Sequence, residues 1–591
     1  MKNIRLIMTG LESHNVDADA YLMNLCFGDW CKQWIEEDKN NIPTNILAHP
    51  WVDNKRYEDD YGKVMSSFHT MSTVLAKVLS DELNASDSLR YWQIIVGPWL
   101  SRFLTVVEEH NVLISEVLFR YSDYNLTYLL PKSPDDFCAN NSSEAIKHLE
   151  SRAFNARLYS DLLKSVKADN LKYSIEQIPS YQQSYSEPGK SLFSSIKPIL
   201  KTINALFIGS ILKLFYFKHV YIGSYLSLKD RIKISWSNRS FSVLSLPIDS
   251  RTVSNETDIK LRQNLTALAC REMPEKDHVL IELVFRYLPK CFLETFEFYD
   301  LKAKKITKGC PKVIISGIGD LILDSEISRF WIANKVLSGA KLITRQHGGV
   351  YGSAKFMMLE QLQRNNADVF LSWGWMGSGV RPMPLSPIKQ SLIPKCDSEK
   401  VTIVLVAFPL FFYHMFPSPQ SAKFLSYIRT IRKLCIDLKN ECSLSITLRR
   451  YPQDFSWDVD GLLEDLDVHM TRFPDTTLEA DLNASCLAII TYDSTSHLET
   501  FRHNYPTLLL FSPDFIVPRE DAKVAFAALK RVGILHEDIE SVKKFLSVTM
   551  PNIQEWWLSE ETQGALDIYK RMFALESSDF SKRWNRLLSE L

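Results

Sequence analysis

Residues 487–511 read LAIITYDSTSHLETFRHNYPTLLLF, and this stretch decides the fold. Its two apolar ends predict buried strands, and the spacing of the apolar residues between them predicts a helix. Two buried strands joined by a helix form the repeating unit of a parallel α/β sheet. The polar residues that follow the first strand, Asp493, Ser494 and Thr495, are therefore expected at the carboxyl edge of such a sheet.

The same alternation of strand and helix continues on both sides of this stretch. After residue 400, the predicted elements are strands at 402–407, 444–448, 487–491 and 507–511 and helices at 422–438, near Leu462 and at 497–503. Before residue 380, they are strands at 312–315, 341–344 and 368–372 and a helix at 325–337. Between the two series, the prolines of RPMPLSPIKQSLIP (residues 381–394) predict a linker. The sequence thus predicts an α/β fold with two Rossmann-like domains.

The length of the chain agrees with more than one domain. Its 591 residues exceed the roughly 250–300 residues beyond which a single core stops growing. We expect an amino-terminal domain over 1–390 with helical insertions, a carboxyl-terminal ligand-binding domain over 395–550, and terminal helices over 551–591. The apolar spacing in 567–591 predicts a helix with one buried face, packed on either domain.

Charge and cysteine usage narrow the class of protein. The 69 basic and 70 acidic residues nearly cancel, which argues against wholesale binding to nucleic acid. The amino terminus, MKNIRLIMTGL, predicts a short strand and lacks the apolar run and cleavage site of a secretory signal. The ten cysteines form no C-x-x-C pair, as expected for reduced thiols and not for a zinc site. We therefore expect a cytoplasmic protein.

Residues 191–228 bear on the question of membrane contact. They contain KPILKTINALFIGSILKLFYFKHVYIG, in which Lys201, Lys213 and Lys218 interrupt the apolar residues. The uninterrupted run is much shorter than the ~20 residues that cross a bilayer, so we expect no transmembrane helix here. Two interpretations stay open, namely a basic amphipathic helix on an anionic membrane surface and a buried helix that runs into a strand at 220–222.

A first candidate site loop is TRQHGGVYG, residues 344–352, directly after a predicted strand. Gly348 and Gly349 allow the backbone to approach a ligand closely, and His347 can exchange a proton near neutral pH. These features indicate a catalytic edge. A glycine turn with a hydrogen-bonded histidine would have the same pattern.

A second candidate is the strand-to-helix loop in ITYDSTSHLET, residues 490–500. The hydroxyls of Ser494 and Thr495 and the free N–H groups of the first helical turn suit a phosphate. An ordinary capped helix is the alternative interpretation, because caps of this composition are common.

A third candidate is LRRYPQD, residues 448–454, at another strand end. Arg449 and Arg450 can pair with phosphate or carboxylate, although adjacent side chains diverge and a solvated basic pair is the alternative. The sequence contains no Walker A motif, no G-x-G-x-x-G fingerprint and no clear D-x-D metal motif near these loops. We expect no metal and no dinucleotide cofactor.

Seven segments along the chain together resemble the surface-carbohydrate transferase family first named from a Leptospira locus. They are FGDWC (27–31), HPWVDNKRYEDDY (49–61), SLRYWQIIVGPWL (88–100), RQHGGVYG (345–352), FLSWGW (370–375), RRYPQDFSW (449–457) and TYDSTSHLETF (491–501). More distantly, the histidine-glycine, arginine-proline and hydroxyl-pair loops are similar to those of Kdo transferases, polysialyltransferases and teichoic-acid glycerophosphotransferases.

The resemblance implies a GT-B-like architecture, in which two Rossmann-like domains face a central cleft. It also implies that the terminal helices over 551–591 cross back to the amino-terminal domain. It implies a glycosyltransferase of capsule or O-antigen biosynthesis that uses a nucleotide-sugar donor, often a CMP-linked acidic sugar such as Kdo or a nonulosonate. The acceptor would be a glycan or lipid-linked glycan, which suggests peripheral association with the inner membrane. A CDP-linked polyol-phosphate transferase and a non-catalytic polysaccharide-binding protein remain the alternatives.

The residues and the resemblance together assign roles within the expected site. Donor binding is expected from Gln346, Gly348, Gly349, Arg449, Arg450, Ser494, Thr495 and Glu499, with the hydroxyl pair on phosphate, an arginine on phosphate or sugar carboxylate, and the glutamate on a ribose hydroxyl. His347 is expected to act as acid or base. Asp29 is expected to act as nucleophile or base, although the family pattern implies glutamate at its position.

Overall fold

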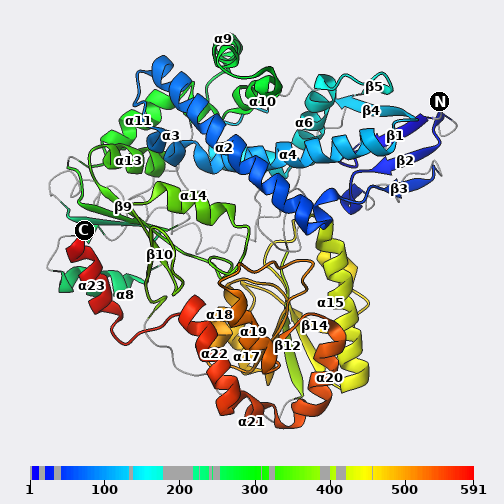
Figure 1. The fold of residues 1–591 in the computed structure, drawn as a ribbon, viewed down its shortest axis with the longest axis vertical. Coiled ribbons are helices and arrows are strands. Elements are labelled where there is room, and N and C mark those ends of the chain that lie inside the picture. Colours follow the sequence, from blue (N-terminus) through cyan, green and yellow to red (C-terminus); the bar gives the residue numbers. More distant parts are fainter. Residues whose placement is uncertain are drawn as a thin grey trace.

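The computed structural model contains three parallel sheets, each flanked by helices (Figure 1). It describes residues 3–11, 20–31, 42–131, 137–176, 217–224, 226–238, 242–243, 253–307, 309–317, 326–386, 399–407, 421–455 and 457–591. Every strand pair within these sheets is parallel. Loops at the carboxyl ends of their strands are therefore the places to look for a ligand site.

The first sheet has the strand order β3-β2-β1-β4-β5. Its strands are β1 (Asn3–Ile7), β2 (Met23–Cys26), β3 (Thr44–Ile46), β4 (Asn125–Pro131) and β5 (Leu171–Glu176). The helices that follow its strands are η2 (Pro50–Val52), α2 (Asn54–Leu83), α3 (Leu89–Ile95), α4 (Gly97–Arg120), α5 (Ser142–Glu150) and α6 (Arg152–Ser165). Strand β3 forms one edge of this sheet, and all three of its residues are exposed.

The second sheet has the order β11-β10-β9-β8-β6-β7. Its strands are β6 (His219–Ile222), β7 (Ser242–Val243), β8 (Val313–Ser316), β9 (Lys341–Arg345), β10 (Val369–Ser372) and β11 (Val380–Pro382). Its helices and short turns are α8 (Leu228–Ser237), α9 (Ile259–Arg271), η4 (Glu275–Asp277), α10 (His278–Tyr287), η5 (Lys290–Phe292), α11 (Phe296–Lys304), α13 (Glu326–Leu337) and α14 (Met358–Asn366). Alternate side chains of the buried strands enter two separate core clusters, one on each face.

The third sheet has the order β14-β13-β12-β15-β16-β17. Its strands are β12 (Lys400–Val404), β13 (Ser445–Arg449), β14 (His469–Thr471), β15 (Leu487–Ile490), β16 (Thr507–Leu510) and β17 (Leu535–His536). Its helices are α15 (Ser421–Cys442), α16 (Val459–Leu463), α17 (Leu478–Asn483), α18 (Thr495–Arg502), α19 (Lys523–Arg531), α20 (Ile539–Thr549), η6 (Met550–Asn552), α21 (Ile553–Leu558) and α22 (Glu560–Phe573). Counted along the chain, this is the Rossmann order 3-2-1-4-5-6, and the order reverses between β12 and β15.

The predicted α/β, GT-B-like class with two Rossmann-like sheets is confirmed by the second and third sheets. The described residues of the range 1–390, however, form two sheets and not one, because within them β1 to β5 pair only among themselves. Within the proposed linker over 381–394, the first residues belong to edge strand β11, and 387–398 lie outside the described residues. The predicted helix within 191–216 also lies outside them, whereas 220–222 belong to β6.

The last helix, α23 (Phe580–Glu590), packs on the second sheet and not on the third. Its residues Phe580, Trp584 and Leu588 share a core cluster with β8 and β9, and it lies beside α8 (Figure 1). The preceding helix, α22, packs on α19 of the third sheet. Within the described part of the chain, none of the helices has the length and apolar character needed to cross a membrane.

Candidate functional site

Two loops from different sheets meet at the candidate site. One, the HG loop (Gln346–Ser353), follows β9 of the second sheet. The other follows β15 of the third sheet and leads into α18. Because β15 borders the point where the strand order of the third sheet reverses, this second loop occupies the position at which doubly wound sheets bind ligands.

The contact between the two loops depends on glycine. A Cβ atom added at Gly349 would lie 1.9 Å from the carbonyl oxygen of Ser494 and 3.1 Å from the nitrogen of Thr495. A Cβ at Gly348 would instead lie 3.8 Å from Thr495 Oγ1, an ordinary contact distance. Gly349 therefore lets the backbone of the HG loop lie directly on the start of α18, and we call this contact the seam.

A buried carboxyl group reinforces the seam. The Ser353 hydroxyl donates a 2.7 Å hydrogen bond to Asp493 Oδ2, so it links the HG loop to the residue that precedes Ser494. The other carboxyl oxygen of Asp493 is buried without a hydrogen-bond partner among the described residues. Burial raises the pKa of Asp493 to about 7, and the hydrogen bond from Ser353 opposes that rise. A protonated Asp493 is thus favoured in this site below neutral pH.

Two further polar side chains, those of His497 and Tyr569, lie behind Asp493 in the core of the third sheet. His497 Nε2 lies 3.7 Å from Asp493 Oδ1 and 2.9 Å from the hydroxyl oxygen of Tyr569 on α22. Burial lowers the pKa of His497 to about 3, so its imidazole is neutral at physiological pH. The carboxyl group of Asp493 therefore gains no compensating positive charge from this neighbour.

His347 lies at the start of the HG loop, with its ring edge-on to Tyr351 at 4.8 Å between centroids. Burial lowers the pKa of His347 to about 3. At physiological pH the imidazole is therefore neutral. It can accept a proton, but it lacks the second N–H proton that an imidazolium would donate. In the free protein, this favours the role of base over that of acid.

Gln346 holds the HG loop from within. Its Nε2 donates to the carbonyl oxygens of Gly348 (2.8 Å) and Tyr351 (3.4 Å). Its Oε1 accepts from the backbone N–H of Trp373 (2.9 Å) and the indole N–H of Trp375 (2.8 Å). With both donors and the acceptor engaged, the Gln346 amide shapes the loop and has no free group for a ligand.

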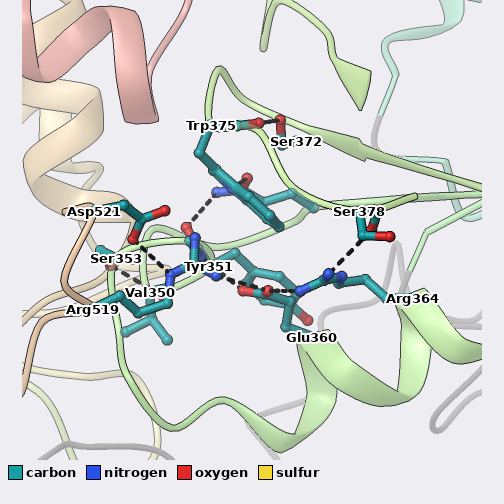
Figure 2. A network of polar contacts seen from close by, with 12 residues as sticks. Val350, Tyr351, Ser353, Glu360, Arg364, Ser372, Trp375, Ser378, Arg519 and Asp521 are labelled. Atoms are coloured by element: carbon teal, nitrogen blue, oxygen red, sulfur yellow. Dashed lines mark hydrogen bonds and ion pairs between the residues drawn. The ribbon is translucent and has the colours of Figure 1, made fainter. Parts of the chain in front are cut away.

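Next to the HG loop, an ion pair joins the second and third sheets (Figure 2). Glu360 on α14 accepts from the backbone N–H of Gly352 at 2.8 Å and pairs with Arg519 at 3.3 Å. The Arg519 guanidinium also lies over the Trp375 ring, 4.7 Å from its centroid. Backbone hydrogen bonds from Arg519 to Ser353 and from Lys355 to Val517 complete this junction. The seam is thus one part of a larger contact between the second and third sheets, which also includes this ion pair and these backbone hydrogen bonds.

The hydroxyl pair at the start of α18 remains available. Ser494 is the N-cap of α18, and its Oγ accepts only a long 3.4 Å hydrogen bond from the Ser496 N–H. Thr495 is half-buried, and its hydroxyl makes no hydrogen bond to the described residues. Glu499, one turn further along, is partly exposed and lies 3.6 Å from Arg502 Nη1. The first turn of α18 thus offers hydroxyl and N–H donors at the seam.

Both arginines of the third candidate loop are engaged within their own domain. Arg449 is buried, and its guanidinium pairs with Asp481 Oδ2 at 2.6 Å and with the hydroxyl of Thr476 at 3.0 Å. Arg450, whose side chain is 10% exposed, pairs with Asp460 Oδ1 at 2.5 Å. Asp460 is more than half exposed, so Arg450 can exchange this partner for a ligand more easily than Arg449 can.

The predicted catalytic residue Asp29 belongs to the first sheet and is not part of the two loops that form the seam. Asp29 follows β2 at the carboxyl edge of the first sheet, beside Trp30, whose indole N–H donates to the carbonyl oxygen of Met8. Among the described residues, no hydrogen bond or ion pair joins Asp29 to His347 or to the start of α18. The predicted site residues therefore divide into the seam, the neighbouring arginine loop and a separate edge.

Sequence reasoning missed three residues that build the seam: Ser353, Glu360 and Arg519. For Asp493, the sequence indicates only a position at the carboxyl edge of the sheet. Ser353 and Asp493 flank the loops that were singled out, so their polar character was the available signal. The partner of Glu360 is 159 residues away in the chain, and no local pattern indicates such a contact.

The fold and the seam define an α/β protein in which the N-terminus of helix α18 lies at the junction of two Rossmann-like sheets. The family model described as LIC12162 family transferase matches residues 5–588, and the chain belongs to that family. It is therefore a member of a transferase family. No curated protein matches the chain with significant similarity.

Several solved structures share parts of the architecture at low similarity. MurG of Acinetobacter baumannii is 11% identical, with a TM-score of 0.30, over 63% of this chain and 100% of its own. S. aureus MnaA, solved with UDP, is 12% identical, with a TM-score of 0.35, over 62% and 95%. The UDP-GlcNAc 2-epimerase of Neisseria meningitidis is 10% identical, with a TM-score of 0.34, over 63% and 99%.

Proposed function

We propose that the chain is a glycosyltransferase that binds a nucleotide-sugar donor at the seam. One observation carries this proposal, namely the direct contact of Gly349 with the backbone at Ser494. That contact brings a histidine-bearing loop of one sheet to the N-terminus of a helix in another. A donor bound there would touch both sheets at once.

The donor phosphate would bind at the start of α18. The hydroxyls of Ser494 and Thr495 and the unpaired N–H groups of the first helical turn can donate to its oxygens. These donors would also stabilise the negative charge that develops on the leaving nucleotide when the bond between the anomeric carbon and the phosphate oxygen breaks. Glu499, one turn further on, would accept from a ribose hydroxyl.

His347 would receive the proton of the acceptor. An acceptor hydroxyl oxygen would form the new bond to the anomeric carbon as the nucleotide leaves, and the hydroxyl proton would pass to the neutral imidazole. A nearby phosphate anion raises the pKa of a histidine, so donor binding itself would make His347 a better base. Asp29 stays a second candidate for this role, from the carboxyl edge of the first sheet.

We further propose that the donor is a CMP-linked acidic sugar such as Kdo or a nonulosonate. Arg450 is the better candidate for a sugar carboxylate, because its present partner is an exposed aspartate. Arg449 would keep its buried pair with Asp481 and hold the loop. The product would be a capsule or O-antigen glycan, made at the cytoplasmic face of the inner membrane on a glycan or lipid-linked glycan acceptor.

A nucleotide panel tests the proposal. Thermal unfolding is measured with CMP, CDP, UDP, GDP and ADP, because a ligand of the native state raises the melting temperature as its concentration exceeds Kd. The proposal expects the largest rise with CMP. Incubation with CMP-sugar and CDP-polyol donors, followed by product mass measurement, separates sugar transfer from polyol-phosphate transfer. A panel in which no nucleotide has an effect would instead favour a non-catalytic polysaccharide-binding protein.

A further inference from the structure

Helix α8 carries an apolar stripe that faces solvent. Leu228, Ile232 and Trp236 are 55%, 49% and 85% exposed, and their spacing of four residues places them on one side of the helix. Trp236 is the most exposed large apolar side chain of the described residues. Ten of the eleven other tryptophans among the described residues are buried, so this exposure is unusual for the residue type in this chain.

The opposite side of α8 packs against the core of the protein. Ile234 is completely buried in the cluster that also contains Trp584 and Leu588 of α23. Asn238, just past the end of α8, donates a 2.8 Å hydrogen bond to Asn585 of the same helix. The helix is therefore fixed by its inner side, and the exposed stripe adds nothing to that attachment.

Basic side chains flank the stripe. Lys229 and Lys233 follow Leu228 and Ile232 by one residue each, about 100° further around the helix axis. Both are exposed, and neither forms an ion pair with the residues that the structure describes. The only acidic residue of α8, Asp230, is engaged by the N-cap hydroxyl of Ser227. A row of apolar side chains beside unpaired lysines is the pattern of a helix that lies in a membrane interface.

The neighbouring helix adds charge of the same sign. In α23, which contacts α8, Lys582, Arg583 and Arg586 are exposed, whereas Glu590 is its only acidic residue. Lysines and arginines within a Debye length of an anionic bilayer attract it, and tryptophan prefers the level of the lipid headgroups. Figure 1 shows the two helices together at one end of the molecule.

We infer that the outer surface of α8, with the basic residues of α23 beside it, is a docking surface for an anionic phospholipid bilayer. The stripe would enter the headgroup region, with Trp236 as its deepest aromatic anchor and the lysines on lipid phosphates. This inference gives a location to the membrane association proposed above, and it is independent of donor binding at the seam.

The position of α8 connects this surface with the site. The helix begins after β6, at the same carboxyl edge of the second sheet from which the HG loop leaves β9. Only β8 lies between these two strands, so the two loop origins are roughly 10 Å apart. A bilayer held against α8 would keep a lipid-linked acceptor within reach of His347.

Vesicle co-sedimentation of the full chain tests the inference. The vesicles are phosphatidylcholine alone, or phosphatidylcholine with a minor share of phosphatidylglycerol. The variant Leu228→Ser/Ile232→Ser/Trp236→Ser should lose at least about tenfold in partitioning to the anionic vesicles. The variant Lys229→Gln/Lys233→Gln should lose roughly tenfold on anionic vesicles and little on neutral ones. The matched control Ile259→Ser/Leu268→Ser removes exposed apolar side chains from α9 and should bind as the parent does.

A second readout does not depend on the triple variant being stable. Brominated phosphatidylcholine quenches tryptophans that enter the bilayer, so the parent should lose fluorescence in anionic vesicles that contain it. Trp236→Phe should abolish this loss while it retains most of the sedimentation, because phenylalanine is also apolar.

Three results would overturn the inference. If the parent sediments with anionic vesicles but the α8 variants do so equally, another surface binds the membrane. If the parent does not sediment at all, or if the triple variant changes only the oligomeric state, a bilayer is not the partner of the stripe. CMP binding measured in parallel by thermal shift keeps each outcome separate from a failure of the proposed transferase function.

Discussion

Asp493 is the residue whose protonation most directly affects the seam. Its carboxyl group is buried, accepts a hydrogen bond from Ser353 and has a pKa raised from 3.8 to about 7 by burial. The folded state therefore keeps a proton between about pH 4 and pH 7, whereas the unfolded state has lost it. In this interval the unfolded state binds fewer protons, so stability falls as the pH rises, by at most about 1.4 kcal/mol per pH unit.

Asp493→Asn removes this titration and keeps a group that can accept from Ser353. The melting temperature of the variant should approach that of the parent near pH 4, exceed it by a growing margin up to pH 7 and keep that margin above pH 7. The exposed control Asp169→Asn should show no such trend. A margin that does not change with pH would mean that Asp493 is ionised in the native state throughout.

His347 is the residue to which we assign proton transfer. His347→Ala should lower kcat by the ~10²–10⁴ typical of general acid–base catalysis and change the KM of the donor little. His469→Ala, an exposed histidine on β14, is the matched control and should leave both parameters unchanged. A variant with the turnover of the parent would remove His347 from the mechanism.

The low pKa of His347 gives this assignment a second test. Because burial lowers that pKa to about 3, the imidazole of the free protein is neutral throughout pH 5 to pH 8. The profile of kcat/KM, which reports the free enzyme, should therefore have no acid limb near pH 6.5 that disappears in His347→Ala. Such a limb would show that the histidine is solvated and titrates normally.

At the scale of elements, the seam depends on two adjacent glycines in unequal ways. Gly349→Ala would put a Cβ atom 1.9 Å from the Ser494 carbonyl oxygen, so the HG loop and the start of α18 must move apart. Overpacking of this kind costs about 1–3 kcal/mol, and it should weaken CMP binding by tenfold or more. Isothermal titration calorimetry measures the affinity, and thermal unfolding measures the stability.

Gly348→Ala is the matched control for this substitution. Its Cβ atom would meet only the Thr495 hydroxyl, at 3.8 Å, so the seam should stay closed and the melting temperature should stay close to that of the parent. Equal effects of the two substitutions on stability and affinity would mean that the contact of Gly349 with Ser494 has no special role.

The elements themselves were largely predictable where the local pattern is strong. The predicted strand at 487–491 corresponds to β15 and the predicted helix at 497–503 to α18, because apolar runs and helical spacing are local signals. The short strands β14 and β17 were not predicted. Three and two residues long, they carry too few apolar positions for a pattern, and pairing with β13 and β16 defines them.

The site was predictable only in part, because a contact between two sheets leaves no local pattern in the sequence. The loops with His347 and Ser494 stand out in the sequence, and because each follows a predicted strand, each is expected at the carboxyl edge of a sheet. That Gly349 touches Ser494, or that Arg519 pairs with Glu360, depends on how two sheets meet, and no local pattern encodes this. Arg449 looked like a ligand-binding arginine because its partner Asp481 lies 32 residues away.

At the scale of the whole molecule, the sheet of β1 to β5 is the main feature that the sequence did not indicate. Its helices reach the third sheet directly, since Asn54 at the start of α2 donates to the carbonyl oxygen of Pro513 and accepts from Lys423 of α15. Lys355 of the second sheet also pairs with Glu58 of α2 at 2.7 Å. The three sheets therefore meet around the region that contains the seam.

The central claim is that a nucleotide binds where the second and third sheets meet, and the affinity for CMP of the variant Ser494→Ala/Thr495→Val tests it most directly. Each lost hydrogen bond to a charged phosphate is worth about 1.5–3 kcal/mol, so the Kd should rise by a hundredfold or more while the fold stays intact. The control Thr477→Val removes the N-cap hydroxyl of α17, a helix that is not part of the seam, and should lower stability by about 1 kcal/mol without changing the Kd. An unchanged Kd in the double variant, or no CMP binding by the parent at all, would contradict the claim and leave Ser494 and Thr495 as ordinary helix-capping residues.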